Sequence, residues 1–129
     1  MIRVLAYAWA APWSAVGLLF APFTAGAGGV VRLRRGVVEI GGGPVVPRVL
    51  ARLLPGGAAA VTLGHVVLGT DEHALMVTRD HERVHVRQYE RWGPLFPLLY
   101  GLASLTAAAR GGHYYRDNRF EREARDLSR

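Results

Sequence analysis

An uncharged run from Val4 to Val31 constrains the fold of this chain more than any other feature. A helix that crosses a bilayer needs about 20 such residues, so the run predicts an N-terminal membrane helix. Pro12 and Pro22 argue against one uninterrupted helix, although proline is better tolerated in membrane helices than in soluble ones. We therefore separate an apolar segment, residues 1–29, from a folded domain, residues 30–129.

Two other interpretations of this run stay open. Ala25-Gly26-Ala27 resembles a signal-peptidase site, so the run could be a cleaved signal and the rest of the chain secreted, although the run exceeds the usual signal core of about 7 to 15 residues. It could also be a buried helix of a soluble protein. If it is retained and spans the membrane, the arginines at 32, 34 and 35 outweigh Arg3 and the N-terminal amine, which puts the domain in the cytoplasm.

Turn residues and apolar runs after this segment predict a small sheet of three strands. We expect a hairpin at residues 30–34 and 37–40 turning at Arg35-Gly36, a helical turn or two at 48–54 ended by Pro55-Gly56-Gly57, a third strand at 61–69, and an exit loop at 71–73. Residues 75–92 then follow the helical period and stop at Gly93-Pro94.

Two further helices complete the expected α+β fold. Residues 95–109 carry no charge but are too few to span a bilayer comfortably, so we expect a buried or membrane-dipping helix. Residues 118–127 form a charged last helix. The chain of 129 residues supports one compact domain, and because it has no cysteine, any metal must be held by histidines and carboxylates.

The segment His81-Glu82-Arg83-Val84-His85, an HExxH pattern, lies inside the expected helix at 75–92. On a helix the two histidines lie about 40° apart, one turn from each other, so both imidazoles can reach one cation with Glu82 beside them. With five His and six Glu in the chain, the pattern arises by chance about one time in a hundred. The alternative, two satisfied core histidines, leaves several buried polar groups in need of partners.

A catalytic zinc site usually has three protein ligands, so a third is required, and Glu121 is the candidate. It lies at the edge of the apolar stripe of Phe120, Ala124 and Leu127. The alternative is a capping box, in which Asn118 begins the helix and Glu121 reaches back to its amide. Weaker ligand candidates are Glu39, Glu72 and His113, and we expect surface or structural roles for His65, His73 and His113.

The opposite side of the same helix is charged, and we expect it to face solvent. Its members are Arg79, Asp80, Arg83, Arg87 and Glu90. Anionic lipid headgroups are a second possible partner for these arginines, in keeping with the net charge of +6. Nucleic acid is not expected, because no aromatic residues are interleaved with the arginines for base stacking.

Residues 61–127 resemble the gluzincin metallopeptidases, in which HExxH lies on one helix and a Glu, in an ExxA-type sequence, on a later one. Here these are His81–His85 and Glu121-Arg122-Glu123-Ala124. The extension to Gln88 and the stretch from Asn118 to Ala124 resemble small uncharacterised bacterial zincin-like proteins. One departure is Arg125, where many gluzincins have an Asp, with Asp126 one residue later.

The resemblance implies a zincin-like minimal core with one Zn²⁺ per chain, held by His81, His85 and Glu121, and with Glu82 as the general base of peptide hydrolysis. Candidates for outer-shell or oxyanion contacts are Gln88, His113, Tyr114, Tyr115 and Arg119. The first alternative to this membrane-associated peptidase is a non-catalytic, zinc-stabilised, membrane-tethered interaction module. The second is a basic membrane-surface adaptor without metal. The sequence does not identify the peptide or protein substrate.

Overall fold

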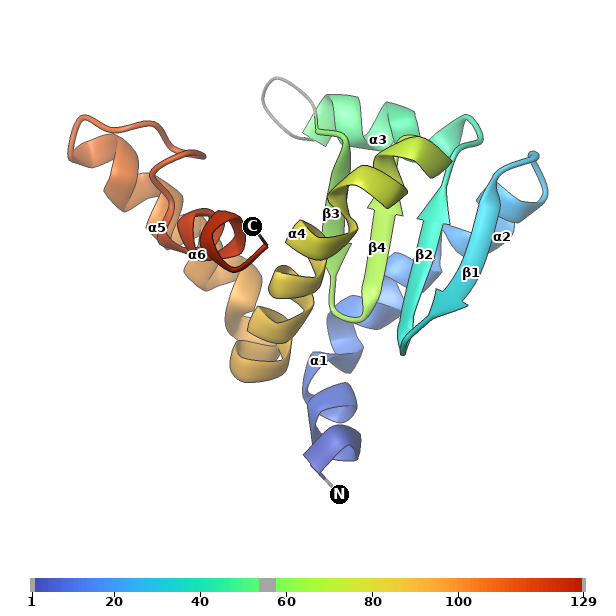
Figure 1. Ribbon diagram of the computed structural model, residues 1–129, viewed down its shortest axis with the longest axis horizontal. Helices are drawn as coiled ribbons and strands as arrows, with labels where there is room; N and C mark the ends of the chain where they lie inside the picture. Colours follow the sequence, from blue (N-terminus) through green and yellow to red (C-terminus); the bar gives the residue numbers. More distant parts are fainter. Residues whose placement is uncertain (1, 54–57, 129) are drawn as a thin grey trace.

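The computed structural model describes residues 2–53 and 58–128 as an α+β fold around a small mixed sheet (Figure 1). The strands are β1 (Val30–Arg34), β2 (Val37–Gly41), β3 (Ala60–Leu63) and β4 (Val66–Gly69). They lie in the order β1-β2-β4-β3, so β1 and β3 form the two edges. The central pair β2 and β4 is parallel and the two outer pairs are antiparallel.

The predicted hairpin at 30–40 is confirmed, but the prediction of three strands is wrong. Residues 61–69 do not form one strand, because the chain reverses at Gly64 and His65 and pairs with itself as β3 and β4. Gly64 has φ +63°, and a Cβ there would lie 2.3 Å from the Ser14 hydroxyl oxygen, so glycine is required. Residues 61–69 are mostly apolar on both sides of the turn, so the sequence pattern does not mark where the chain reverses.

The helices are α1 (Ile2–Leu18), α2 (Ala21–Ala25), α3 (Val45–Leu53), α4 (Glu72–Trp92), the 3₁₀ turn η1 (Gly93–Leu95), α5 (Phe96–Ala109) and α6 (Arg119–Leu127). In Figure 1, α4 lies in front of the sheet, α1 lies behind it, and α5 and α6 form an arm beyond α4. The expected helix at 48–54 begins earlier, at Val45, and its predicted stop at residues 55–57 lies outside the described residues.

The expected exit loop at 71–73 is wrong, because α4 already begins at Glu72. Asp71 is its N-cap, and the carboxylate accepts a 2.7 Å hydrogen bond from the backbone N–H of Ala74. At the other end the helix stops where the sequence predicted, at Gly93 with φ +60°. A Cβ at Gly93 would lie 2.2 Å from the Trp9 ring, so this glycine also makes room for α1.

The prediction that the charged side of α4 is solvated fails at two arginines. Arg79 binds the buried carboxylate of Glu39 on β2 through two hydrogen bonds of 2.9 and 3.1 Å. Arg83 donates to the backbone carbonyls of Arg34 and Arg35 in the β1–β2 turn. These arginines therefore fasten the helix to the sheet, whereas Arg87 is exposed.

One buried cluster joins four helices and so sets the position of the arm. Ala10 of α1, Tyr89 of α4, Phe96 of α5 and Phe120 of α6 pack together, and the ring centroids of Phe96 and Phe120 are 5.0 Å apart. This cluster holds α6 against α4, which brings the last helix to the HExxH segment.

Candidate metal centre

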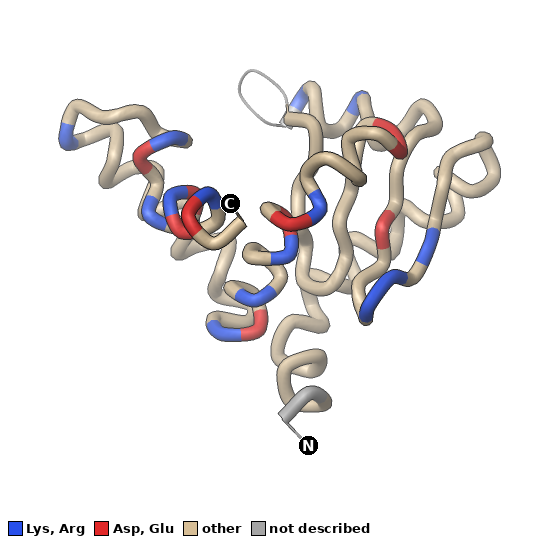
Figure 2. The backbone as a smooth tube through the Cα atoms, in the orientation of Figure 1, with Lys and Arg blue, Asp and Glu red and all other residues tan. Residues whose placement is uncertain are grey.

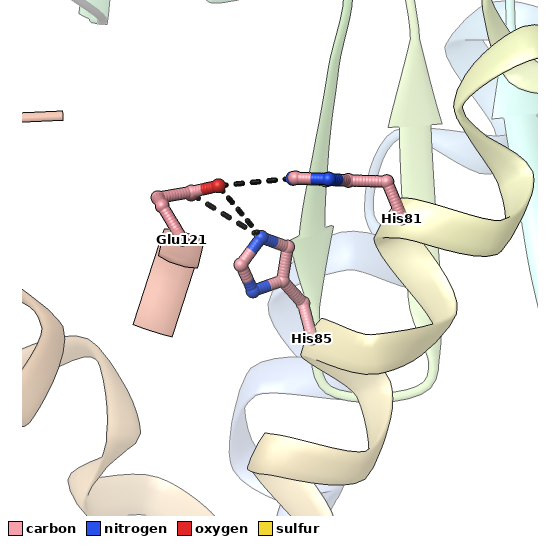
Figure 3. A group of neighbouring side chains, drawn as sticks. All are labelled: His81, His85 and Glu121. Atoms are coloured by element: carbon pink, nitrogen blue, oxygen red, sulfur yellow. Dashed lines mark hydrogen bonds and ion pairs between the residues drawn. The ribbon is translucent and has the colours of Figure 1, made fainter. Parts of the chain in front are cut away.

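Helices α4 and α6 bring together His81, His85 and Glu121, the three residues expected to share a metal (Figure 3). The Nε2 atom of His81 lies 2.9 Å from Oε1 of Glu121, and the Nε2 atom of His85 lies 3.2 Å from the same oxygen. One donor atom from each residue lies within 4.8 Å of the others, and among the described residues no other such group forms. His85 and Glu121 are buried and His81 is half-buried.

The chemistry and spacing of this donor set fit a metal ion. Zinc binds imidazole nitrogen and carboxylate oxygen at about 2.0 to 2.2 Å, so two ligands in a tetrahedral site lie about 3.3 Å apart. The observed separations of 2.9 and 3.2 Å are within a few tenths of an ångström of that value. The third separation, between the donor nitrogens of the two histidines, is within 4.8 Å, so the cluster could hold a metal ion.

Gln88 orients His85 from the side away from Glu121. The Gln88 Oε1 atom lies 2.7 Å from His85 Nδ1, and its Nε2 donates to the Phe120 carbonyl at 3.0 Å and to Glu123 at 2.9 Å. Because both amide protons are used on α6, the amide oxygen accepts from Nδ1–H of His85. With Nδ1 held by Gln88, Nε2 of His85 faces Glu121 and is the atom that would bind a metal once it gives up the proton it donates to Glu121.

The helix cap and the ligand position fall on different residues of α6. Asn118 caps the helix by accepting a 2.8 Å hydrogen bond from the backbone N–H of Phe120. The Glu121 carboxylate is bonded instead to His81, His85 and Tyr100. The reciprocal half of a capping box is therefore not made, and Glu121 occupies the ligand position.

Glu82 points to β3 and is not one of the converging donors. Its side chain is 6 % exposed, and its Oε1 accepts a 2.9 Å hydrogen bond from the Thr62 hydroxyl. Burial raises the pKa of Glu82, and the nearby His85 and the Thr62 hydrogen bond partly offset that rise. The residue is thus a carboxylate beside the site, with a raised proton affinity and one fixed oxygen.

The electrostatics of the cluster favour a positive charge between the side chains. Burial acts to raise the pKa of Glu121, but hydrogen bonds from His81, His85 and Tyr100 outweigh it and hold that pKa well below its usual range. Burial acts to lower the pKa of His85, but its bond to Glu121 and the charge of Glu82 raise it to about 9. Two buried carboxylates around two imidazoles therefore attract a cation.

Tyr100 belongs to the site, although the sequence reasoning missed it. Its hydroxyl donates a 2.6 Å hydrogen bond to Oε2 of Glu121, while His81 contacts Oε1 and His85 lies 3.2 Å from both oxygens. The α5 backbone at this point is held by Asn118, whose Nδ2 donates to the Tyr100 carbonyl at 3.0 Å. The available signal was that Tyr100 is the one titratable side chain in the uncharged stretch 95–109.

The other four residues predicted to contact the site, His113, Tyr114, Tyr115 and Arg119, have different surroundings. Burial, followed by the charges of Glu121 and Glu82, raises the pKa of Tyr115, so this phenol stays neutral beside the site. His113 accepts backbone hydrogen bonds inside its own loop and stacks on Tyr114. Arg119 is exposed, with its guanidinium 5.4 Å from the centre of the Phe120 ring.

The weaker ligand candidates have other partners. Glu39 is held by Arg79, and Glu72 lies at the exposed start of α4, 3.0 Å from Arg32. His65 is buried beside Glu90, and His73 is exposed. The metal cluster includes none of them.

The chain matches no protein-family model, no curated protein and no solved structure. The candidate metal centre therefore rests on the geometry alone.

Proposed function

We propose that this protein is a membrane-associated, zinc-dependent metallopeptidase of the gluzincin type with a zincin-like core. The observation that carries the proposal is the convergence of His81, His85 and Glu121, with the buried Glu82 one residue from the first ligand. Gln88 supports it, because oriented imidazoles are what a metal-binding histidine pair needs. The metal is proposed to be zinc, one per chain, since two imidazoles and one carboxylate are a catalytic zinc donor set.

The chain's own residues supply the proton transfers in this proposal. Zinc, when bound, lowers the pKa of a coordinated water toward neutrality and polarises a carbonyl. Glu82 accepts one proton of the attacking water, whose oxygen bonds to the peptide carbonyl carbon. Glu82 then passes that proton to the leaving amine as the C–N bond breaks, so one water is consumed and Glu82 returns to its starting state. The hydroxyls of Tyr100 and Tyr115 are the nearest candidates for stabilising the developing oxyanion.

The substrate is proposed to be a peptide in an extended conformation. β3 is an edge strand, and its Thr62 contacts Glu82, so a peptide added to that edge lies beside the general base. Backbone hydrogen bonds then supply most of the binding, and shallow pockets set the side-chain preference.

The second candidate function is a non-catalytic, zinc-stabilised interaction module, and one observation favours it. Glu82 is only 6 % exposed. A hollow of about 390 Å³ beside α1 and another of about 150 Å³ between α4 and α6 are both lined by other residues than the metal cluster and Glu82. A buried Glu82 is poorly placed to meet a substrate, which a non-catalytic site does not require.

Membrane association is proposed from the N-terminal helices. Residues Val4–Ala25 are long and apolar enough to cross a membrane by length and composition, and 11 % of the most apolar stretch is buried. Contacts of α1 with the sheet and α4 support its retention rather than cleavage as a signal. For a segment that spans the bilayer, Arg32, Arg34 and Arg35 after the apolar run would put the domain in the cytoplasm.

Metal analysis and peptide cleavage together test the proposal. The full chain should carry about one zinc, which His85→Ala and Glu121→Ala lose and Glu82→Gln keeps. Glu82→Gln should abolish cleavage of an unfolded protein substrate. Full zinc content in Glu121→Ala refutes the three-ligand site. Zinc bound at full content with no cleavage by wild type, across a panel of unfolded substrates, favours the interaction module.

A further inference from the structure

Helix α1 is docked on the folded domain by polar contacts along its length. The Tyr7 ring stacks on the buried His65 at 3.8 Å, the Ser14 hydroxyl accepts from the His65 backbone N–H at 2.9 Å, and Trp13 donates to the Pro94 carbonyl at 3.0 Å. Gly64 and Gly93 leave the room that the helix occupies. A helix crossing a bilayer alone would break all these contacts, so the docked helix is not oriented as an isolated span.

The side of α1 that faces away from the domain is apolar. Ala10, Trp13, Ser14 and Gly17 face inward, and Ala10 is fully buried. The outward residues recur at helical spacing and continue into α2. Their exposed fractions are Val4 68 %, Leu5 61 %, Val16 41 %, Leu19 67 % and Phe23 63 %.

Helix α5 presents a second exposed apolar face. Leu98, Leu102 and Leu105, spaced four and three residues apart, are 62 %, 51 % and 69 % exposed, whereas Phe96 and Ala107 on the other side are buried. Figure 2 shows α1 and α5 almost free of charged residues, while α4, α6 and β1 carry them. Both helices contribute to one buried cluster, Ala10 from α1 and Phe96 from α5.

The charged residues beside the apolar faces of α1 and α5 indicate what these faces bind. Exposed arginines, Arg91 and Arg110, bracket α5, and the chain carries sixteen arginines against ten acidic residues. Trp9, 45 % exposed, lies beside Arg91, to whose carbonyl it donates. An apolar face with aromatic and arginine edges has the chemistry of a helix lying in the headgroup region of an anionic bilayer.

We propose that the outward faces of α1 and α5 form one platform that lies in the plane of a single anionic membrane leaflet, so that the protein is monotopic. The proposal rests on the membrane association proposed above and specifies its mode. With these two helices in the lipid, the charged helices α4 and α6, which hold the metal cluster, stay in water at the membrane surface.

Spin labels on single cysteines test this orientation cleanly, because the chain has no cysteine of its own. The full chain is labelled at Val4, Leu19, Leu98 or Leu105, with the exposed Arg87 as the aqueous control, and bound to vesicles of phosphatidylcholine and phosphatidylglycerol. We expect the labels at all four sites to lie about 5 to 10 Å below the membrane surface and the label at Arg87 to stay in water. A spanning α1 separates Val4 and Leu19 by about 20 Å in depth and leaves Leu98 in water, which overturns the platform but not membrane association.

A triple substitution tests the contribution of α5. Leu98→Gln, Leu102→Gln and Leu105→Gln together should weaken co-sedimentation with these vesicles at least tenfold, while Arg87→Gln changes it less than threefold. Unchanged co-sedimentation of the triple variant removes α5 from the platform. If the labels at Leu98 and Leu105 are instead shielded from water in the absence of vesicles, and the protein is a dimer under the same conditions, the α5 face is a contact between two copies and the proposal is wrong. Labels that stay in water with vesicles present overturn membrane association as well.

Discussion

Replacing Gln88 with Ala tests how the candidate centre is held in place. The substitution leaves the Nδ1–H group of His85 without its buried partner and removes the hydrogen bonds from Gln88 to Glu123 and to the Phe120 carbonyl. Each such loss costs about 1 to 3 kcal/mol, so we expect the metal-free protein to lose about 3 kcal/mol of stability. At about 2.1 cal/mol/K of unfolding entropy per residue, a chain of 129 residues then melts about 10 °C lower.

The same substitution should weaken zinc binding separately from the fold. Losing the partner that orients a metal-bound histidine typically costs 10- to 100-fold in metal affinity. Thermal unfolding of the chelator-treated protein measures the first effect, and competition with a chromophoric chelator at fixed pH measures the second. Arg87→Ala, at the exposed neighbouring position on α4, is the matched control and should change neither. If Gln88→Ala melts lower but binds zinc as tightly as the wild type, the argument about His85 orientation is wrong.

Three further predictions concern the scaffold and are read by thermal or urea unfolding. Gly64→Ala should destabilise the folded protein by about 2 to 4 kcal/mol, because the alanine would have a positive φ and would clash with α1. Gly101→Ala, in open space on α5, is the control and should stabilise the protein by about 0.5 to 1 kcal/mol. Equal effects of the two substitutions would refute the packing argument. Arg79→Ala should cost about 1 to 3 kcal/mol, because the buried Glu39 carboxylate loses both hydrogen bonds from Arg79 and keeps only its 3.5 Å contact with Arg32. Adding Glu39→Gln should recover part of that loss, and no recovery would count against the argument. Burial raises the pKa of the Tyr89 phenol, so the contribution of this side chain to the free energy of unfolding is fully present below about pH 10 and is lost as the pH rises further. Tyr89→Phe should therefore make the loss of stability at alkaline pH less steep.

The sequence predicted α4 and α6 well because both carry strong local signals. The helical period and Gly93 define α4, and Asn118 followed by an apolar stripe defines α6. The sequence predicts a loop at Asp71, because an acidic residue after a strand suits an exit turn as well as an N-cap. Only the packed structure distinguishes the two.

The remaining errors have a tertiary origin. The β3–β4 turn was missed because the surrounding residues are apolar on both faces, so no alternation marked the reversal at Gly64. Arg79 was assigned to solvent because a helical pattern cannot show that Glu39, forty residues earlier, lies buried opposite it. Tyr100 stands out in the sequence as the one titratable side chain of its stretch, but nothing in the sequence shows that α5 packs its hydroxyl against Glu121.

His85 and Glu121 are far apart along the chain, so a metal bound to both would cross-link the fold. The two residues are 36 positions apart, and a cation bound to both closes a loop of that length. In the chain-entropy description, a cross-link over such a loop is worth about 4 kcal/mol. Without cysteine the chain cannot form a disulfide. A metal bound at this site would therefore act as a reversible cross-link on the α5–α6 arm, which a chelator would remove without any redox step.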